Sequence, residues 1–456
     1  MDKKKIFFVG IGGIGMSGLA LVAKRMGLYV EGSDIEESYI TQKLKKENIK
    51  IYSSHCAANV SCDTDYVVVS SAIKDNNPEI IRARKLGIKI LKRAEFLADI
   101  SFGKRVIAVA GCHGKTTTTG MITSIFEFSK IPHTAVIGGI LKNVEDNALY
   151  RGDDYFIIEA DESDGTFLHY SPLVSCITNI DSDHLDYYKT TQAIKKAFIE
   201  FINKTPYYGM AVICGDDPNI KSIKRFLTAP TYTYGFDKGN IWSVKFNGVD
   251  KGKTIFEIFY KGKKDAKISL SVFGRHNILN AASAYIASRY LGVDKKKIKQ
   301  GLENFKGMKR RLDLIKKIDD IYFYDDYAHH PSEIKATLLA LKNLHPHFKI
   351  IAIFQPHRYS RSAYLIDEFS LCFDKANELY VMDIYPSGEE NAYGITSEKI
   401  IERISHKHPS VHKFIDSLSI VKKLKPKTIV VSLGAGDVYK TILDISLKYE
   451  SLIKEI

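Results

Sequence analysis

Cysteine is scarce in this sequence and follows no pattern typical of a metal site or a disulfide framework. The 456 residues include six cysteines, and no two of them form a C-x-x-C pair. A zinc-finger type of protein and a small disulfide-stapled scaffold are therefore excluded. The length instead suggests about three domains, each large enough to bury its own core. Reduced thiols are typical of the cytoplasm, where we expect this protein to act.

Long apolar runs are also absent, apart from one stretch near the N-terminus. Three lysines, Lys3 to Lys5, precede an uncharged segment over residues 6–23 that superficially resembles a signal peptide. Its five glycines would weaken a membrane helix, and no small-residue cleavage site follows it. No other segment suits a bilayer. We therefore expect no signal peptide, no membrane span and no membrane partner.

Acidic residues are outnumbered by basic ones, which leaves a formal net charge of +13. Such an excess is compatible with binding to nucleic acid, acidic lipid or a phosphorylated small molecule. The lysines, however, fall in scattered surface-type runs such as 295–297 and 422–423, and no basic stripe is interleaved with aromatic residues. A nucleic-acid-binding ATPase is therefore disfavoured, and we expect no nucleic-acid partner.

Short apolar runs that predict strands alternate with helical patterns through most of the chain, which is typical of parallel sheets covered by helices. Between residues 232 and 272 the pattern becomes a period-two alternation, which predicts antiparallel strands at a sheet edge. We therefore expect an α/β protein of three domains. They are a Rossmann-like parallel sheet over 1–103, a central P-loop ATPase-type domain with an antiparallel β edge over 104–307, and a Rossmann-like α/β domain over 308–456. The predicted strands are 6–9, 29–31, 66–69, 106–110, 155–158, 175–180, 254–260, 267–272, 321–324, 350–354, 378–382 and 428–433.

A glycine motif, Gly10-x-Gly12-x-x-Gly15, follows the first predicted strand and precedes a helical pattern. Asp34 lies nineteen residues beyond Gly15, at the end of the next strand. Glycines in this context let backbone amides approach a diphosphate at the N-terminus of a helix, where the helix dipole favours anions. The motif therefore predicts a diphosphate ligand. An NAD-dependent oxidoreductase is an alternative, but it leaves the other motifs of the chain without a role.

A second phosphate-type loop, residues 110–118, follows the strand predicted at 106–110 and opens a helix. Lys115 would reach the β and γ phosphates of ATP, and Thr116 would bind Mg²⁺. The loop departs from the standard pattern because Val109 stands in place of its first glycine. We expect ATP and one or two Mg²⁺ ions as cofactors, with Mn²⁺ as a substitute.

Two predicted strands of the central domain end in acidic clusters, at 159–164 and at 181–186. Because the carboxyl ends of parallel strands meet at one edge of a sheet, both clusters should face the phosphate loop. Magnesium prefers such hard oxygen ligands, shared with phosphates. Individual members of these clusters could equally be helix caps or solvated loop residues.

Further polar clusters lie at 274–280, 310–313, 325–331 and 354–361. Asn277 and Asn280 share a helix face, which suits an adenine edge or simple capping. Arg358 and Arg361 stand three residues apart and could both bind one carboxylate or phosphate. Any one of these residues alone would more often be structural.

Together these motifs resemble the Mur ligases, with matches in order from Phe7 to Asp437. The glycine-rich N-terminus and the segment 357–361 are most similar to the alanine-adding members, whereas murein tripeptide recycling ligases share most other motifs. The resemblance implies ATP-dependent ligation of L-alanine to the lactyl carboxylate of UDP-N-acetylmuramate through an acyl phosphate, a step of peptidoglycan precursor synthesis. Recycling ligation is the alternative. The implied partners are these small molecules, and the protein is expected to be a monomer or a homodimer.

The resemblance also implies roles for single residues. The implied metal ligands are Thr116, Glu159 and His184. The implied ATP contacts are Gly111, His113, Gly114, Lys115, Thr116, Thr117, His276, Asn277, Asn280, Arg311 and Asp325. The implied contacts to the UDP substrate are Gly12, Ile14, Gly15, Asp34, His55, Ser71 and Arg93. The implied amino-acid contacts are Tyr327, His329, His357, Arg358 and Arg361. The implied catalytic residues are Lys115, His184, Arg311 and His357.

Overall fold

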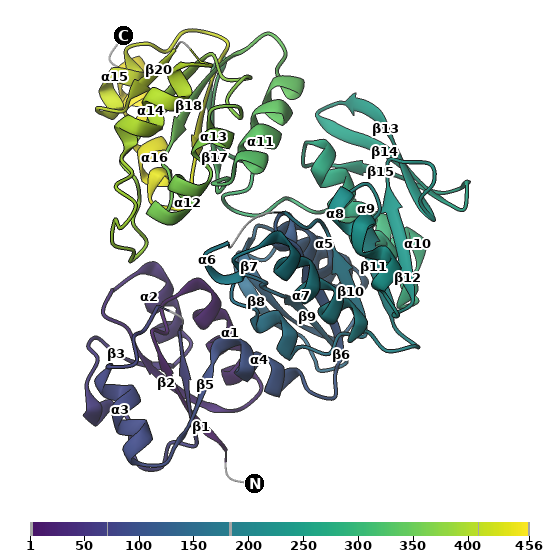
Figure 1. Cartoon of the computed structure of the whole chain (residues 1–456), viewed down its shortest axis with the longest axis vertical. Helices are drawn as coiled ribbons and strands as arrows, with labels where there is room; N and C mark the ends of the chain where they lie inside the picture. Colours follow the sequence, from purple (N-terminus) through teal and green to yellow (C-terminus); the bar gives the residue numbers. More distant parts are fainter. Residues whose placement is uncertain (1–2, 71, 182–184, 409, 455–456) are drawn as a thin grey trace. The chain divides into compact units, whose positions relative to one another are not determined.

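The computed structural model describes residues 3–70, 72–181, 185–408 and 410–454 (Figure 1). The chain forms two compact units. The first runs to Asn247 and also includes Ile255–Leu270 and Ile278–Lys306, and the second comprises Gly248–Thr254, Ser271–Asn277 and the chain from Gly307 onward. Across the described ranges, no helix combines the length and the apolar character that crossing a bilayer requires.

The first unit begins with a five-stranded parallel sheet in the order β3-β2-β1-β4-β5, as predicted. Its central strand β1 is almost wholly buried, because Phe7, Phe8 and Val9 pack between the helices on both faces of the sheet. The strands are β1 (Lys5–Val9), β2 (Tyr29–Ser33), β3 (Lys50–Tyr52), β4 (Tyr66–Val69) and β5 (Lys89–Lys92). The helices are α1 (Ile14–Arg25), α2 (Tyr39–Lys46), α3 (Pro78–Lys85) and α4 (Arg93–Ser101), with a 3-10 turn η1 (Ala57–Asn59).

The same unit contains a ten-stranded mixed sheet in the order β15-β14-β13-β12-β11-β10-β6-β9-β7-β8. Its strands are β6 (Arg105–Ala110), β7 (His133–Leu141), β8 (Asp146–Tyr150), β9 (Tyr155–Glu159), β10 (Val174–Ile177), β11 (Met210–Cys214), β12 (Thr231–Gly235), β13 (Trp242–Asp250), β14 (Lys253–Tyr260) and β15 (Lys263–Leu270). Its helices are α5 (Lys115–Ser129), α6 (Leu185–Tyr188), α7 (Thr191–Asn203), α8 (Pro218–Ile223), α9 (Arg275–Tyr290) and α10 (Lys295–Glu303), with 3-10 turns η2 (Thr166–His169) and η3 (Lys224–Phe226).

Two details of this sheet differ from the sequence prediction. The strand predicted at 175–180 ends at Ile177, because Thr178 and Asn179 turn away to bond the carbonyl of His113. The prediction of an antiparallel edge within 232–272 also did not include the pairing of β12 with β13, which is parallel over a short overlap. The loop between them is folded back by Asp216, which accepts hydrogen bonds from Phe236 N and Asn240 Nδ2.

Helix α1 packs against β7 and β8, which joins the two sheets of the first unit. Gly18 allows this approach, because a Cβ on it would lie 2.9 Å from Asn147 Nδ2 and 3.3 Å from Ala148 Cβ. Asn147 Nδ2 donates to the carbonyl of Ile14 at 2.5 Å, and Lys43 pairs with Asp146 at 2.8 Å. The glycine-rich start of the chain thus serves packing as well as its predicted turn.

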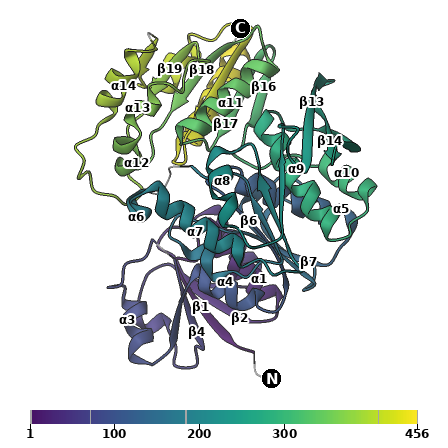
Figure 2. The ribbon, with the colours of Figure 1, turned by 45° about the vertical axis from the view of Figure 1, so that its right-hand side comes forward.

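The second unit is built on a six-stranded sheet in the order β16-β17-β21-β18-β19-β20, in which only β16 runs antiparallel to its neighbour. Helices α11 and α14 pack on one face of this sheet, and α15 and α16 pack on the other. Figure 2 labels α11 and α14 together with β16 to β19 of the sheet. The strands are β16 (Asp313–Ile318), β17 (Ile321–Asp326), β18 (Lys349–Phe354), β19 (Glu378–Val381), β20 (Val411–Lys413) and β21 (Thr428–Leu433). The helices are α11 (Pro331–Leu344), α12 (Tyr359–Tyr364), α13 (Ile366–Phe369), α14 (Ser397–Ser405), α15 (Ser417–Val421) and α16 (Val438–Lys454).

Candidate functional site

The predicted phosphate loop lies between β6 and α5 and depends on two glycines. Gly111 and Gly114 adopt φ values of +131° and +83°, which side chains rarely allow. A Cβ on Gly111 would lie 2.1 Å from Thr178 Oγ1, and one on Gly114 would lie 2.6 Å from Asn280 Oδ1. The structure therefore brings the predicted adenine-site residue Asn280 against the loop, at the point where α5 begins.

Lys115, the first residue of α5, is held inside this loop. Its Nζ donates to the carbonyl of Gly111 at 2.7 Å and to both carboxylate oxygens of Glu162 at 2.8 Å. Burial alone would lower the pKa of Lys115, but the carboxylates of Glu162, Asp161 and Glu159 raise it above the ordinary lysine value. Burial raises the pKa of Glu162, but Lys115, which donates to both carboxylate oxygens, opposes this shift and favours the charged carboxylate. Lys115 thus stays charged at every physiological pH.

The predicted metal ligands Thr116 and Glu159 lie together. Thr116 Oγ1 donates to Glu159 Oε1 at 3.0 Å, and the backbone N–H of Gly138 donates to the other carboxylate oxygen at 2.8 Å. A hydroxyl and a carboxylate are the hard oxygen donors that Mg²⁺ prefers, so the pair fits a divalent cation. His184, the third predicted ligand, lies outside the described residues.

The neighbouring loop residues are also fixed. The His113 backbone N–H donates to Asn179 Oδ1 at 2.8 Å, and its ring Nε2 lies 3.2 Å from Asp181 Oδ2. Thr117, a predicted ATP contact and the third residue of α5, is buried. The acidic clusters after β9 and β10 therefore supply contacts to the phosphate loop, as their position at the strand ends predicted.

The glycine turn after β1 is occupied by a carboxylate of the protein itself. The backbone N–H of Gly12 donates to Asp34 Oδ2 at 2.7 Å, and the Glu36 N–H donates to Asp34 Oδ1 at 3.0 Å. Asp34 thus fixes the turn by bonding an amide that the sequence assigned to a diphosphate. In this structure, the Gly12 amide is therefore bonded to Asp34.

The adjacent helix start retains the features of an anion site. A Cβ on Gly15 would lie 3.3 Å from Arg93 Nη1, so the guanidinium of Arg93 lies beside the first turn of α1. The positive end of the helix dipole and a guanidinium both favour an anion at this place. Ile14, the first residue of α1, is 38% exposed. The structure therefore places Arg93 beside Gly15 and Ile14 at the start of α1.

His55, assigned to the UDP substrate, belongs to a polar cluster at the carboxyl ends of β2 and β3. Its Nδ1 lies 2.8 Å from Glu79 Oε2, to which Ser33 Oγ donates at 2.7 Å. Asn59 Nδ2 donates to the other oxygen of the fully buried Glu79 at 2.8 Å. Ser71, assigned to the same ligand, lies outside the described residues.

In the second unit, Asp325 is buried at the end of β17 and bonded through both carboxylate oxygens. Arg310 Nε donates to one at 3.1 Å, and Ser432 Oγ to the other at 2.6 Å. The Arg310 guanidinium also lies over the rings of Tyr327 and Tyr439, at 5.0 Å and 4.7 Å from their centroids. The sequence analysis placed Arg310 only in the polar cluster 310–313, because the resemblance assigned its neighbour Arg311 to the ATP site.

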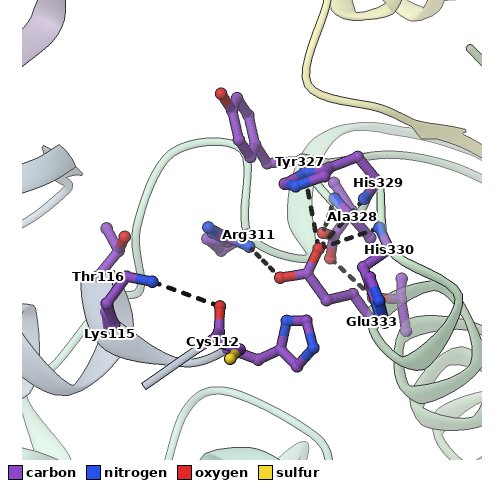
Figure 3. A network of polar contacts seen from close by, with 12 residues as sticks. Cys112, Lys115, Thr116, Arg311, Tyr327, Ala328, His329, His330 and Glu333 are labelled. Carbon is purple, nitrogen blue, oxygen red and sulfur yellow. Dashed lines mark hydrogen bonds and ion pairs between the residues drawn. The ribbon is translucent and has the colours of Figure 1, made fainter. Parts of the chain in front are cut away.

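Arg311 pairs with Glu333, the third residue of α11, at 3.6 Å (Figure 3). The same carboxylate accepts the backbone N–H of His329 at 3.2 Å and so caps the helix that follows. His276 lies at the start of α9, where its ring folds back over Gly274, and Asn277 Nδ2 donates to the carbonyl of Phe273 at 2.7 Å. These side chains are thereby fixed by local contacts.

The predicted amino-acid residues form one cluster at the carboxyl ends of β17 and β18. The rings of Tyr327 and His329 lie 5.4 Å apart, and those of His329 and His357 lie 5.9 Å apart. Arg361 Nη1 lies 3.4 Å from His357 Nδ1. The Arg358 backbone, with φ of +69°, begins α12 next to this group. The five residues predicted to bind the amino acid come from the segments 325–331 and 354–361, and the fold brings these two segments together.

Burial lowers the pKa of His357 to about 3, and the positive charges of Arg361, Arg358 and Arg310 act in the same direction. The ring is neutral at physiological pH, and Nδ1 accepts the hydrogen bond from Arg361. It also stacks on Tyr385, with centroids 5.5 Å apart and ring planes 6° from parallel. The cluster thus presents guanidinium charge beside a neutral imidazole, which suits an anionic group such as a carboxylate.

Sequence reasoning missed Glu162 and Glu79 as members of the two sites. Glu162 stood within the acidic segment 159–164, but its sequence position could not tell which carboxylate would meet Lys115. Glu79 follows Pro78 at the start of α3, where an acidic residue is also common as a helix-end charge. Neither residue carried a signal that separates a buried functional partner from an ordinary surface acid.

Comparison with known proteins gives three consecutive matches to one family. Residues 5–105 match the Mur ligase family catalytic domain, residues 109–288 the Mur ligase middle domain, and residues 310–436 the Mur ligase glutamate ligase domain.

Similar curated proteins are UDP-N-acetylmuramate–L-alanine ligases. The one from Desulforapulum autotrophicum is 41% identical over 448 residues, covering 96% of this chain and 98% of its own. The one from Rickettsia felis is 41% identical over 449 residues, covering 95% and 94%.

Among solved structures, the UDP-N-acetylmuramate–alanine ligase of Thermotoga maritima superposes with a TM-score of 0.83 at 30% identity, covering 98% of this chain and 99% of its own. A murein peptide ligase of Psychrobacter arcticus superposes with a TM-score of 0.73 at 24% identity, covering 97% and 98%, and shows the shared fold.

Proposed function

The chain belongs to the Mur ligase family, and from this premise we propose that it joins L-alanine to the lactyl carboxylate of UDP-N-acetylmuramate at the expense of ATP. The products are UDP-N-acetylmuramoyl-L-alanine, ADP and phosphate. The observation that carries this proposal is the loop at Gly111–Lys115, where two glycines with positive φ and a buried lysine form a site suited to phosphate. Sequence identity near 40% over the full length of alanine-adding ligases supports L-alanine, rather than a tripeptide, as the substrate that is added.

Membership of the family implies the use of ATP and a divalent metal ion. Lys115 neutralises the phosphates, with the loop amides of Gly111, His113 and Gly114 around them. Asn277 and Asn280 contribute polar groups for adenine, beside His276.

We propose that Thr116 and Glu159 hold Mg²⁺, or Mn²⁺ in its place, together with His184. The donor set fits, since Thr116 and Glu159 already converge at 3.0 Å. When bound, the ion supplies neutralisation of phosphate charge. The hydroxyl of Thr116 and the carboxylate of Glu159, which share a hydrogen bond in the structure, would hold the ion.

The UDP substrate is assigned to the first domain, which the sequence predicts over residues 1–103. Arg93 and the first turn of α1 at Ile14 and Gly15 bind its diphosphate. Asp34 and His55 lie at the ends of β2 and β3, where the uridine and sugar groups would extend from this helix start.

The amino acid is assigned to the cluster at 327–361. Arg358 and Arg361 bind its carboxylate, and the neutral His357 keeps the charge of the group complementary to that anion. Tyr327 and His329 limit the space for the side chain. Alanine binding then depends on carboxylate recognition, which leaves the amine available to react.

The reaction requires two steps that these residues can assist. The lactyl carboxylate attacks the γ-phosphorus of ATP, ADP leaves, and an acyl phosphate remains. The alanine amine then attacks the acyl carbon, phosphate leaves, and the amine proton is released. Lys115 and Arg311 supply positive charge where the transferred phosphoryl group carries negative charge. Asp325 is assigned to the ATP ribose. The proposal places this chemistry in the cytoplasm, with small molecules as its only partners.

Phosphate release in the presence of UDP-N-acetylmuramate, while the amino acid is varied, tests the proposal. L-Alanine should give the highest kcat/KM among alanine, serine and glycine, and no phosphate should appear without the sugar nucleotide. Faster turnover with the alanyl-glutamyl-diaminopimelate tripeptide than with L-alanine, at the same UDP-N-acetylmuramate concentration, would overturn the assignment in favour of the murein tripeptide recycling ligase.

A further inference from the structure

The ammonium of Lys115 is saturated by acceptors of the protein itself. It has three N–H donors, and the structure offers it the Gly111 carbonyl at 2.7 Å and the two oxygens of Glu162 at 2.8 Å. The Cys112 carbonyl adds a longer contact at 3.4 Å. The side chain of Glu162 is only 1% exposed. The positive charge of Lys115, which the proposed function assigns to phosphate, is therefore neutralised by the nearby Glu162 carboxylate.

The main chain around Glu162 fixes the carboxylate in this position. The Glu162 carbonyl accepts hydrogen bonds from Tyr188 Oη at 2.6 Å and from the Gly165 N–H at 3.0 Å. Gly165 adopts φ of +72°, and a Cβ on it would lie 2.8 Å from Tyr187 Oη. The turn that follows β9 is thus closed from two sides. The main chain thus holds Glu162 beside Lys115, which distinguishes it from a mobile acid on the surface.

A phosphate group and Glu162 require the same donors of Lys115. Both are anions, and an ammonium that bonds two carboxylate oxygens and one carbonyl has no further N–H to offer. Separating a buried pair of opposite charges is unfavourable, because each charge loses its close partner. Part of the attraction between Lys115 and a nucleotide must therefore be used to break the contact with Glu162.

We infer that Glu162 is a resident competitor of the nucleotide phosphates for Lys115, which weakens nucleotide binding and thereby favours release of the ADP product. This role rests on the proposed function, because it concerns the loop assigned to ATP. A carboxylate in this position lowers the affinity of the loop for nucleotide phosphates. Glu162 bonds the lysine in the empty site, gives it up when phosphate binds, and takes it back when ADP leaves.

Calorimetric titration of MgADP into the full-length protein tests the inference. Glu162→Gln keeps the size of the side chain and removes its charge, so MgADP should bind about tenfold more tightly than to the unmodified protein. Glu162→Asp keeps the charge but shortens its reach, and should tighten binding by a smaller factor. Glu127→Gln, which changes an acid at the opposite end of α5 that pairs with Arg151, is the matched control and should leave the affinity unchanged.

The double substitution separates competition for Lys115 from a general electrostatic effect. In a Lys115→Met background, Glu162→Gln should bring little further change in MgADP affinity, because the contested donor is absent. An equal tightening in both backgrounds overturns the inference, and so does weaker MgADP binding by Glu162→Gln. If that variant fails to fold, as judged by its thermal transition, Glu162→Asp decides by the same criterion. Absence of MgADP binding by the unmodified protein overturns the proposed function as well, which distinguishes the two failures.

Discussion

Asn147 of β8 donates a hydrogen bond to the carbonyl of Ile14 at 2.5 Å, and this contact passes directly beside Gly18 on α1. The carbonyl belongs to the first turn of the helix that is assigned to the diphosphate. The contact therefore links the start of that helix to the sheet that carries the phosphate loop. A residue with a side chain at position 18 would occupy the space of the Asn147 amide.

Gly18→Val should lower the stability of the first unit by roughly 1–3 kcal/mol, because overpacking forces α1 away from β8. The measurement is the midpoint of thermal unfolding by scanning calorimetry. Gly13→Ala is the matched control, since Gly13 has φ of −62° and a Cβ there would meet no atom closer than 3.7 Å. Equal midpoints for Gly18→Val and the unmodified protein would contradict the packing role of Gly18.

Lys115→Ala should abolish ligation while UDP-N-acetylmuramate binding stays nearly unchanged. The reason is that Arg93 and the start of α1 lie beside the five-stranded sheet, whereas the phosphate loop follows β6 of the ten-stranded sheet. Turnover is measured by phosphate release, and binding of the sugar nucleotide by calorimetry. Lys142→Ala, on the same unit but outside the loop, serves as the control. Loss of both activities in a folded Lys115→Ala protein would argue against separate sites.

The sequence was sufficient to predict the strand, the loop and the helix of each phosphate site, but it did not identify the acid that binds each donor. Gly12, Lys115 and Thr116 were all predicted from motifs, and each is bonded to a carboxylate, from Asp34, Glu162 and Glu159 respectively. A motif fixes which strand end a residue occupies. It does not fix the rotamer that decides which of several neighbouring acids comes within hydrogen-bonding distance.

Packing between residues that are far apart in the sequence could not be predicted from the sequence either. The contact between Gly18 and Asn147 joins residues from the first two predicted domains, and the structure groups both domains in one compact unit. Periodicity describes which face of α1 is apolar, but it contains no information on the partner that covers this face. The hairpin of β7 and β8 was not predicted either, since its strands show no regular alternation.

The buried carboxylate of Asp326 should make stability depend on pH. Burial raises the pKa of Asp326 to about 6, against the opposing effect of Arg311. A raised pKa in the folded state means that the folded protein binds the proton more tightly than the unfolded chain, so this contribution is present at low pH and is lost as pH rises through about 6.

Asp326→Asn should therefore gain stability relative to the unmodified protein between pH 4.5 and pH 7, by up to about 2 kcal/mol. Thermal melting of both proteins at the two pH values is the measurement, because titration of all other groups cancels in the comparison. The side-chain oxygen of Asn can still accept the N–H of Leu312 or Ala328, which Asp326 accepts in the structure. The same difference in melting temperature at both pH values would show that Asp326 does not titrate in this range.

Arg361→Lys should weaken the apparent affinity for L-alanine by roughly tenfold or more, the effect of about 1.4 kcal/mol. Lysine keeps the charge but loses the planar fork that can bind a carboxylate through two parallel hydrogen bonds. It also loses the contact with His357 Nδ1, which lies 3.4 Å from Arg361 Nη1. Arg358→Lys should have a similar effect through the same loss of geometry.

The KM for L-alanine at saturating ATP and sugar nucleotide measures this effect, and the KM for ATP should barely change. Arg403→Lys is the control, because Arg403 is an exposed residue of α14 that pairs with Asp367. If Arg361→Lys and Arg358→Lys both retained the alanine KM, the carboxylate of the amino acid would have to be bound by other residues. Since His357 is neutral at physiological pH, the assignment of the amino acid to this cluster depends on the two guanidinium groups, and that result would remove it.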